Sequence, residues 1–277
     1  MRVLVTGAGG QLGRALVDAF APRDVIAADH AALDVGDRDA VLAAITTLHP
    51  DLIVHAAAWT DVDGCETDPD RAFRVNALGT RHVAEGARLV GAHLVAISTD
   101  YVFDGTTDRP YVEWDACNPI SVYGRSKRAG ELEVDPGSAI VRTTWVFSEQ
   151  AGLVPAILRL AAGDGPLRFV DDQLACPTYV GDLAPVVRDL ALSRRSGTFH
   201  VTNQGATTPY ELARETLRLA GHDPERVVRV STEELGRAAP RPARSDLDNA
   251  GMRLSGMALL PDHREPLERL VKELTSQ

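Results

Sequence analysis

The feature that most restricts the fold of this chain is a glycine-rich turn near its N-terminus. The segment TGAGGQLG (residues 6–13) separates a short apolar run, residues 3–5, from a segment whose apolar residues recur at helical spacing. Gly7, Gly10 and Gly13 permit a tight turn, a close approach of backbone to a ligand and close packing of helix on strand. Free amides and the helix dipole at such a turn favour an anion. The sequence therefore predicts a strand, a phosphate-binding turn and a helix as its first elements.

The rest of the first half keeps alternating short apolar runs with helical patterns, which is typical of βαβ units and a parallel sheet. We expect further strands at 25–28, 52–54, 94–97 and 140–141. Helices should begin after a capping residue or a cap followed by proline, at Asp37, Asp68-Pro69 and Asn118-Pro119, and the second of these should run to about residue 90.

After Trp145 the pattern changes to helices separated by short strands and proline-rich loops. The helices are expected at 153–162, 182–192, from 208, and 266–274, and the strands at 167–170, 198–201 and 227–230. We predict an α/β protein with a Rossmann-type, doubly wound parallel sheet in residues 1–145. Residues 146–277 should mainly form a smaller C-terminal substrate-binding lobe, with some segments returning to the Rossmann domain.

Composition excludes several classes of partner. The 277 residues carry a net charge of -10 without a basic run, which argues against a nucleic-acid partner. No stretch approaches the roughly 18 consecutive apolar residues of a membrane span, and the first predicted strand leaves no room for a signal peptide. Three scattered cysteines fit neither a disulfide framework nor a zinc site. We expect a reduced, cytoplasmic protein.

Asp29 ends the second predicted strand, 22 residues beyond Gly7. A carboxylate there accepts hydrogen bonds from the adenine-side ribose of a dinucleotide, which favours NAD. No arginine immediately follows Asp29 to bind a ribose phosphate. Use of the phosphorylated form stays open, so the predicted cofactor is NADPH or NADH. The alternative interpretation makes Asp29 a turn residue at a strand end.

Tyr123 and Lys127 lie four residues apart in a predicted helix, so they face the same side. An ammonium group near a phenol stabilises the phenolate, which lowers the tyrosine pKa and lets it exchange a proton with a carbonyl or hydroxyl group. The lysine can also hold the nicotinamide ribose. The pairing is informative because the chain has only one other lysine, Lys272.

Ser98, Thr99 and Asp100 follow the fourth predicted strand, at the carboxyl edge where open α/β sheets place their ligands. A hydroxyl group there can donate a hydrogen bond to a reacting oxygen and polarise it. Thr99 is the preferred candidate and Ser98 the second. The alternative is that both hydroxyls only satisfy backbone groups at the strand end.

These segments carry a family resemblance. The glycine turn, the alanines at 56–58, STDYVFDG (98–105) and SVYGRSK (121–127) resemble the extended short-chain dehydrogenase/reductase superfamily. A narrower set, spread from residue 2 to about 274, resembles dTDP-4-dehydrorhamnose reductases: GQLG, AAAWTDVDGCE, STDYVF, RTTWVF, DDQLACPT and RPARSDL. The resemblance implies reduction of the 4-keto group of a nucleotide-linked 6-deoxyhexulose by a nicotinamide cofactor, in dTDP-rhamnose biosynthesis or a related deoxysugar pathway.

The resemblance also implies roles for individual residues. It makes Thr99, Tyr123 and Lys127 the catalytic hydroxyl, acid and lysine. It places further cofactor contacts at Gly10, Gln11, Leu12, Asp29, Asp34, Val35, Ala56, Ala57, Ala58 and Thr60. Asp100, Tyr101 and Trp145 match the sugar-facing wall, and the alternative interpretation of Trp145 is a packed core residue. Arg241 stands where an arginine can bind the nucleotide diphosphate bidentately.

The sequence departs from the family in its first helix. Some members have a glutamate there that contributes to a magnesium-linked dimer, and the matching residue here is Ala15. We therefore expect no metal site and leave a homodimer open. The acidic stretch 61–70 lacks the glycine and terminal glutamate of an EF-hand, so a solvated loop and helix start explain it better.

Three alternatives remain at the level of sequence. The first is a ketosugar reductase of antibiotic or other deoxysugar assembly with different stereochemistry. The second is a nucleotide-sugar epimerase or dehydratase, although a dehydratase needs a pair of carboxyl groups near the tyrosine and Asp100 offers one. The third is a non-catalytic regulatory subunit, since the regulatory subunit of methionine adenosyltransferase is similar to this family.

Overall fold

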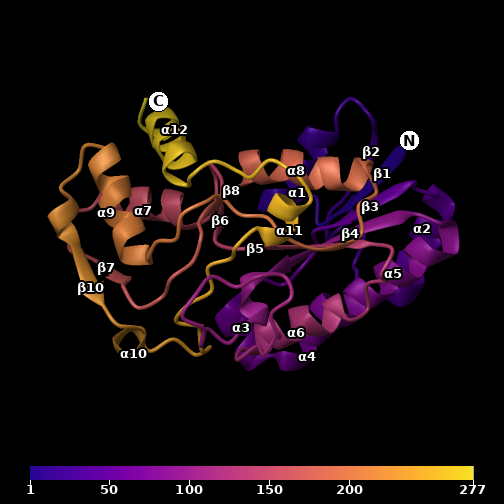
Figure 1. Cartoon of the computed structure of the whole chain (residues 1–277), viewed down its shortest axis with the longest axis horizontal. Helices are drawn as coiled ribbons and strands as arrows, with labels where there is room; N and C mark the ends of the chain where they lie inside the picture. The colour runs from indigo at the N-terminus through magenta and orange to yellow at the C-terminus, as the bar shows by residue number, and fades with distance from the viewer. Residues whose placement is uncertain (277) are drawn as a thin grey trace.

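The computed structural model describes residues 1–276 and is built on a six-stranded, fully parallel sheet (Figure 1). The strand order is β2-β1-β3-β4-β5-β9. The strands are β1 (Arg2–Thr6), β2 (Asp24–Ala28), β3 (Leu52–His55), β4 (His93–Thr99), β5 (Ala139–Thr143) and β9 (Gly197–His200). This confirms the predicted doubly wound α/β fold. The order reverses between β1 and β3, the position at which such sheets bind ligands.

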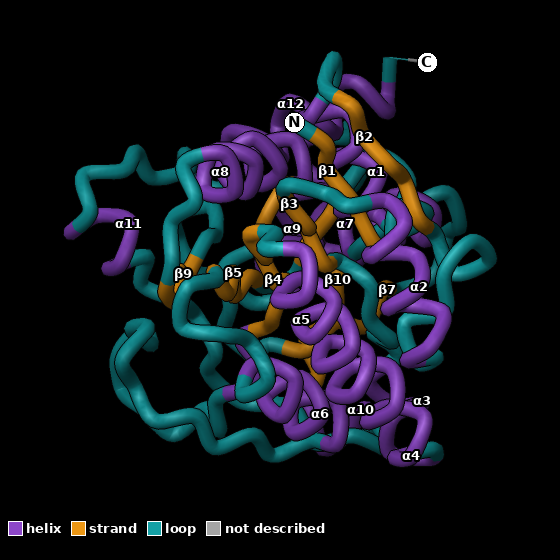
Figure 2. Tube along the Cα trace, turned by 90° about the vertical axis from the view of Figure 1, so that its right-hand side faces the viewer, coloured by secondary structure: helices purple, strands orange, loops and turns teal. Residues whose placement is uncertain are grey.

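Successive residues of the strands face two different helical layers. Val3 and Val5 of β1 pack in one core cluster with α1 and α8, whereas Leu4 packs on the opposite side with α2 and α5. Figure 2 shows the strands between α8 on one side and α5 with α6 on the other. The helices of these layers are α1 (Gln11–Phe20), α8 (Val180–Leu192), α2 (Arg38–Leu48), α5 (Gly79–Val90) and α6 (Val122–Glu131).

Local sequence explains where α2 begins and ends. The Asp37 side chain accepts a hydrogen bond from the backbone N–H of Ala40, which satisfies a free amide of the first turn. His49 takes a left-handed conformation (φ 48°) after the last turn, and Pro50 follows. Both signals were readable in the sequence.

The predicted start of α6 is wrong. The helix begins at Val122, after Ser121, whose hydroxyl accepts a hydrogen bond from the N–H of Gly124. The Asn118 side chain donates instead to Asp104, at 2.9 Å, so it does not cap a helix. The Asn-Pro pair therefore lies in the loop before the helix.

The helix expected from Pro69 to residue 90 is present but interrupted. It consists of α4 (Pro69–Phe73), a π-helical turn (Arg74–Leu78) and α5. Such turns insert one extra residue and often mark functional sites. The side chain of Asn76, which lies in this turn, forms hydrogen bonds with Trp59 and Ser126.

The second half of the chain builds a separate core, at the left in Figure 1. It packs α7 (Leu153–Ala161), α9 (Pro209–Leu219) and α12 (Arg264–Thr275) around the parallel pair β7 (Leu167–Val170) and β10 (Val227–Val230). However, β9, also from this half, is a strand of the six-stranded sheet, and α8 packs against that sheet.

Besides two 3-10 turns (Asp100–Val102 and Pro224–Arg226), the unpredicted short elements are α3 (Val62–Thr67), β6 (Val146–Phe147), β8 (Thr178–Tyr179), α10 (Thr232–Leu235) and α11 (Ala250–Leu254). Within residues 1–276, no helix combines the length and apolar character that crossing a membrane requires.

Candidate functional site

Three adjoining cavities follow the carboxyl edge of the sheet. A central cavity of about 420 Å³ lies between the glycine turn, the end of β4 and α6. A turn-side cavity of about 550 Å³ lies beside the end of β2, and a lobe-side cavity of about 430 Å³ lies against β7 and the loop that carries Arg241. The central cavity shares Gly10 with the turn-side cavity and Trp145 with the lobe-side cavity. Together they form one groove.

Every residue predicted for the site lines this groove. The central cavity is lined by Gly10, Gln11, Leu12, Gly13, Ala56, Ala58, Thr60, Thr99, Asp100, Tyr101, Tyr123, Lys127 and Trp145. The turn-side cavity adds Gly7, Asp29, Asp34, Val35 and Ala57. The lobe-side cavity adds Arg241. Segments that are far apart in the sequence therefore meet along one edge.

The glycine turn has the geometry of a phosphate cradle. Gly7 has a φ of 70°, and a Cβ atom on Gly13 would lie 2.1 Å from the carbonyl oxygen of Gly7. The following helix α1 has no side-chain cap at Gly10 and no acidic residue in its first turn. Its first amides are thus available to an anion, and the helix dipole favours one. These residues fit the diphosphate of a dinucleotide.

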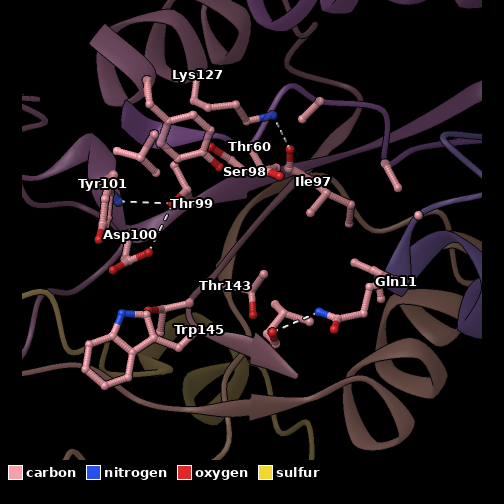
Figure 3. A pocket seen from close by; sticks show the side chains of 18 of the residues that line it. Gln11, Thr60, Ile97, Ser98, Thr99, Asp100, Tyr101, Lys127, Thr143 and Trp145 are labelled. Carbon is pink, nitrogen blue, oxygen red and sulfur yellow. Dashed lines mark hydrogen bonds between the residues drawn. The ribbon is translucent and has the colours of Figure 1, made fainter. Parts of the chain in front are cut away.

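The side chain of Gln11 is held across the groove. Its Nε2 donates to the carbonyl oxygen of Val146 at 2.8 Å (Figure 3). Ser148 donates to its Oε1 at 3.1 Å. Gln11 therefore connects the start of α1 to the segment after Trp145.

The turn-side cavity contains charges of both signs. Asp29 Oδ1 accepts a hydrogen bond from the N–H of Ala32 at 2.9 Å. The Asp34 carboxylate accepts a hydrogen bond from the N–H of Gly36, and this bond lowers the pKa of Asp34. Asp34 also forms an ion pair with Arg74 at 3.3 Å. The guanidinium carbon of Arg71 lies 4.3 Å from the centre of the Trp59 ring.

Tyr123 and Lys127 both face the central cavity, as predicted from their spacing. The Lys127 ammonium donates to the carbonyl oxygen of Ile97 at 2.8 Å (Figure 3). Burial lowers the pKa of Lys127 to about 8. The expectation of a lowered tyrosine pKa is wrong here, because burial raises the pKa of the Tyr123 phenol and the neighbouring Thr99 hydroxyl only partly opposes this. In this structure Tyr123 is a neutral phenol that can donate a proton.

Thr99 and Ser98 point in different directions, because successive strand residues face opposite sides of the sheet. Thr99 Oγ1 donates to Asp100 Oδ1 at 3.0 Å and accepts from the N–H of Tyr101 at 3.2 Å (Figure 3). Ser98 donates to Glu131 at 2.6 Å, behind the groove. Of the two hydroxyls, that of Thr99 therefore lies at the cavity.

Asp100 is a buried carboxyl group whose hydrogen-bond donors are neutral. Besides Thr99, Ser245 donates to its Oδ2 at 2.6 Å. Burial raises the pKa of Asp100 to about 6, although these hydrogen bonds favour the ionised form. Asp100 was expected to face the sugar, but both of its oxygens are bonded to side chains of the protein.

Trp145 connects the central and lobe-side cavities. It is only half-buried, and its φ of 39° is a strained conformation for a bulky residue. Backbone strain of this kind concentrates at functional sites. The interpretation of Trp145 as a packed core residue is therefore wrong.

Arg241 faces the lobe-side cavity but is engaged by a carboxylate. Its Nη1 and Nη2 each donate to Asp63 of α3 at 2.8 Å, and Nη1 also donates to the carbonyl oxygen of Ala239. Arg237 lies 3.6 Å from the same carboxylate. The hydrogen bonds from Arg241 lower the pKa of Asp63 to about 2.

The rest of the acidic stretch also serves the fold. Asp61 caps α3, Asp68 caps α4, and Glu66 accepts a hydrogen bond from the N–H of Val122 at the start of α6. Among residues 1–276, no three His, Cys, Asp or Glu side chains are grouped so that they could hold a metal ion.

Sequence reasoning missed several residues that organise the site. Asn76 accepts from the N–H of Trp59 at 2.8 Å and donates to Ser126 at 3.0 Å, so it connects the loop after β3 to α6. Glu131 and Arg142 form an ion pair at 2.8 Å behind the catalytic pair. The position of Glu131, four residues after Lys127, was the one available signal for it.

Nearly the whole chain is similar to known proteins. The family model described as the RmlD substrate binding domain matches residues 1–276. A dTDP-4-dehydrorhamnose reductase from Streptomyces griseus is 42% identical over 278 residues, which cover 96% of this chain and 91% of the relative. A dTDP-4-keto-6-deoxy-D-glucose reductase from Streptomyces niveus is 39% identical, over 92% of this chain and 91% of the relative.

A crystal structure with the same architecture is that of dTDP-4-dehydrorhamnose reductase from Bacillus anthracis in complex with NADP. It superposes with a TM-score of 0.94 at 38% identity, and the match covers 98% of this chain and 99% of the other. The similarity therefore includes both halves of the chain and is not restricted to the cofactor-binding turn.

Proposed function

This chain belongs to the dTDP-4-dehydrorhamnose reductase family, and on that premise we propose that it reduces the 4-keto group of dTDP-4-dehydrorhamnose with NADPH or NADH to give dTDP-rhamnose. The observation that carries the proposal is the order of groups along the groove. The glycine turn, the Tyr123–Lys127 pair and Arg241 follow one another in three adjoining cavities. That order suits a cofactor, a ketone and a nucleotide diphosphate.

We assign the cofactor to the turn-side and central cavities. The amides of Gln11 and Leu12 would bind its diphosphate, and Asp29 and Asp34 would face its adenosine end. Lys127 would hold the nicotinamide ribose. When bound, the dihydronicotinamide supplies a hydride to C4 of the sugar.

Tyr123 is the proposed proton donor to the keto oxygen. Its raised pKa keeps the phenol protonated at neutral pH, which is the form that an acid must have before the reaction. The Lys127 ammonium stabilises the phenolate that forms. Thr99 is assigned to the same oxygen, and its bonds to Asp100 and Tyr101 hold its hydroxyl at this edge of the cavity.

The substrate is assigned to the central and lobe-side cavities, which makes residues 146–277 mainly a substrate-binding lobe. Tyr101 and Trp145 line both cavities and would contact the sugar. Arg241, with Arg237 and Arg168 on the same cavity, would bind the diphosphate. An enzyme acting on nucleotide sugars with NADPH or NADH fits a cytoplasmic location.

The test is turnover of purified protein with dTDP-4-dehydrorhamnose, with the configuration of the product at C4 determined by NMR. We expect one NADPH or NADH to be consumed for each ketosugar reduced. An epimerase or dehydratase would convert its sugar without net consumption of free cofactor. A protein that bound cofactor but reduced no ketosugar would overturn the proposal and favour a regulatory subunit.

A second candidate is reduction of dTDP-4-keto-6-deoxy-D-glucose. It is favoured by the Streptomyces niveus relative, whose identity of 39% is close to the 42% of the Streptomyces griseus relative. Comparing kcat/KM on the two ketosugars decides between the candidates, because both carry the same nucleotide and differ in sugar configuration.

A further inference from the structure

A buried carboxylate lies behind the catalytic pair, outside the groove. Glu131, in the last turn of α6, has a side chain only 2% exposed and accepts hydrogen bonds from three residues. Ser98 donates at 2.6 Å, Arg142 donates through Nε and Nη2 at 2.8 Å, and Arg128 donates at 2.8 Å. A carboxylate so fully bonded is held in one position.

Glu131 and Lys127 bind neighbouring residues of the same strand. Lys127, one turn earlier in α6, donates to the carbonyl oxygen of Ile97, and Ser98 donates to Glu131. The next residue is Thr99, whose hydroxyl lies at the central cavity. Two side chains of α6 thus fasten the end of β4 immediately before its catalytic hydroxyl.

We propose that Glu131 is a positioning residue of the reduction, which fixes the end of β4 against α6 and keeps the Lys127 side chain in its ammonium form. The inference rests on the proposed function, in which Lys127 holds the cofactor and Thr99 contacts the ketone. It adds a residue that touches neither ligand and acts through Ser98 and Lys127.

The electrostatic part follows from burial. Burial alone drives the Lys127 ammonium towards neutrality, and the negative charge of Glu131 opposes it. Arg128 and Arg142, which bind Glu131, carry positive charges that act against its effect on Lys127. On the strand β3, His55 is also coupled to the charge of Lys127. His55 is neutral, since burial and the charge of Lys127 lower its pKa to about 3. The charge that retains the proton on Lys127 is therefore that of Glu131.

The test is a Glu131→Gln variant, which keeps the volume and an acceptor for Ser98 but removes the charge. The readout is the affinity for NADP⁺ as a function of pH, measured by calorimetry without any ketosugar. For the wild-type protein we expect binding to weaken as the pH rises through about 8, where Lys127 loses its proton. In Glu131→Gln this midpoint should fall by about one pH unit. Binding should then be about 5-fold weaker at pH 8 and about 10-fold weaker well above pH 8.

Two further variants separate charge from packing. Arg128→Gln removes the positive charge of a partly exposed side chain that binds Glu131, while the pair of Glu131 with Arg142 remains, so the midpoint should rise. Ser98→Ala removes the bond to β4 but no charge, so the midpoint should stay unchanged while kcat falls. These two also keep the test decisive if Glu131→Gln fails to fold.

A folded Glu131→Gln protein with the wild-type midpoint would overturn the inference. So would a midpoint in Arg128→Gln that is unchanged or lower than in the wild-type protein. A shifted midpoint in Ser98→Ala would also overturn it. Because the pH titration uses only NADP⁺, its outcome is independent of which sugar is reduced. If the protein reduced no ketosugar but the NADP⁺ titrations shifted as expected, the proposed substrate would be rejected and the role of Glu131 would stand.

Discussion

The central and lobe-side parts of the groove, called the buried end and the lobe-side end below, are held in different ways. At the junction of β4 and α6, the supporting charges of Glu131 and Arg142 are 2% and 3% exposed. At the lobe-side cavity, Arg241 is held by Asp63, which is 34% exposed, and by a loop without regular secondary structure. Buried pairs are costly to break, whereas half-exposed ones contribute little stability.

The difference fits the work assigned to each end. Proton transfer requires fixed distances, so its groups are supported by strands, helices and buried bonds. Recognition of the nucleotide sugar uses residues on loops, which can change without disturbing the sheet. We expect substitutions at the buried end to affect kcat or stability, and those at the lobe-side end to affect KM.

The largest effect is expected for Tyr123→Phe, because it removes the proton donor. We expect kcat to fall by about 10²- to 10⁴-fold while the Kd for NADP⁺ changes little. Steady-state kinetics and calorimetry measure the two quantities. Tyr210→Phe, in the second core, is the matched control and should retain activity. A Tyr123→Phe enzyme with near wild-type kcat would remove the distinction between the two ends.

The second prediction concerns the buried carboxyl group of Asp100. Its folded-state pKa is raised from 3.8 to about 6, so its stabilising contribution is complete below about pH 4 and is lost as the pH rises through 6. The Asn side chain is neutral at every pH, so the free energy of unfolding of Asp100→Asn should lack this pH dependence. In the wild-type protein the dependence amounts to up to about 3 kcal/mol between low and high pH. Urea unfolding of both proteins at pH 4.5 and 7.5 samples about 2 kcal/mol of this difference. Any effect of lost hydrogen bonds that is equal at both pH values cancels. An equal pH dependence in the two proteins would contradict the assignment.

A comparison of Tyr123 with the Asp63–Arg241 pair shows which features of the site the sequence could predict. The glycine turn, the Tyr123–Lys127 spacing and the position of Thr99 are local patterns, and they predicted the sheet and the residues at its edge. The direction of the Tyr123 pKa shift was missed because burial by distant segments determines it. The pair of Asp63 and Arg241 is separated by 178 positions, so no local pattern indicates it.

The wrong start of α6 has the same origin. Asn118 followed by proline is a sound capping signal, but Asp104, 14 residues earlier, uses the Asn118 amide. Likewise, the Asn76 bonds to Trp59 and Ser126 depend on the π-helical turn, which no sequence pattern marked. Sequence therefore predicted which residues reach the groove better than which residues support them.

The third prediction addresses the lobe-side end through Arg241→Gln. Loss of charged hydrogen bonds to a diphosphate should raise KM for the nucleotide sugar by about 10- to 100-fold, with a much smaller effect on kcat. Affinity for NADP⁺ should be unchanged, because Arg241 lines only the lobe-side cavity. Arg241→Lys should be intermediate, since it keeps the charge and loses the planar fork. A loss confined to kcat would place Arg241 with the buried end instead.

The smallest effect is expected for Asp63→Asn, which asks whether the lobe-side end is preorganised. Asp63 fixes the Arg241 guanidinium through two bonds of 2.8 Å and also accepts from the N–H of Ala239, so it sets the conformation of the loop. Its carboxylate also occupies donors that a diphosphate would use. Because the Asp63 carboxylate is 34% exposed, we expect the pair to contribute about 1 kcal/mol, which limits either influence to roughly 5-fold in KM.

We expect the preorganisation of Arg241 to dominate. The Asn side chain can still accept the hydrogen bond from the N–H of Ala239, but it no longer holds both guanidinium nitrogens of Arg241. KM for the nucleotide sugar should then rise about 3-fold with kcat unchanged. Asp61→Asn, which alters a cap of α3 without contacting Arg241, is the control. A fall in KM would mean that Asp63 competes with the diphosphate, and the loop would then be held closed until substrate displaces it.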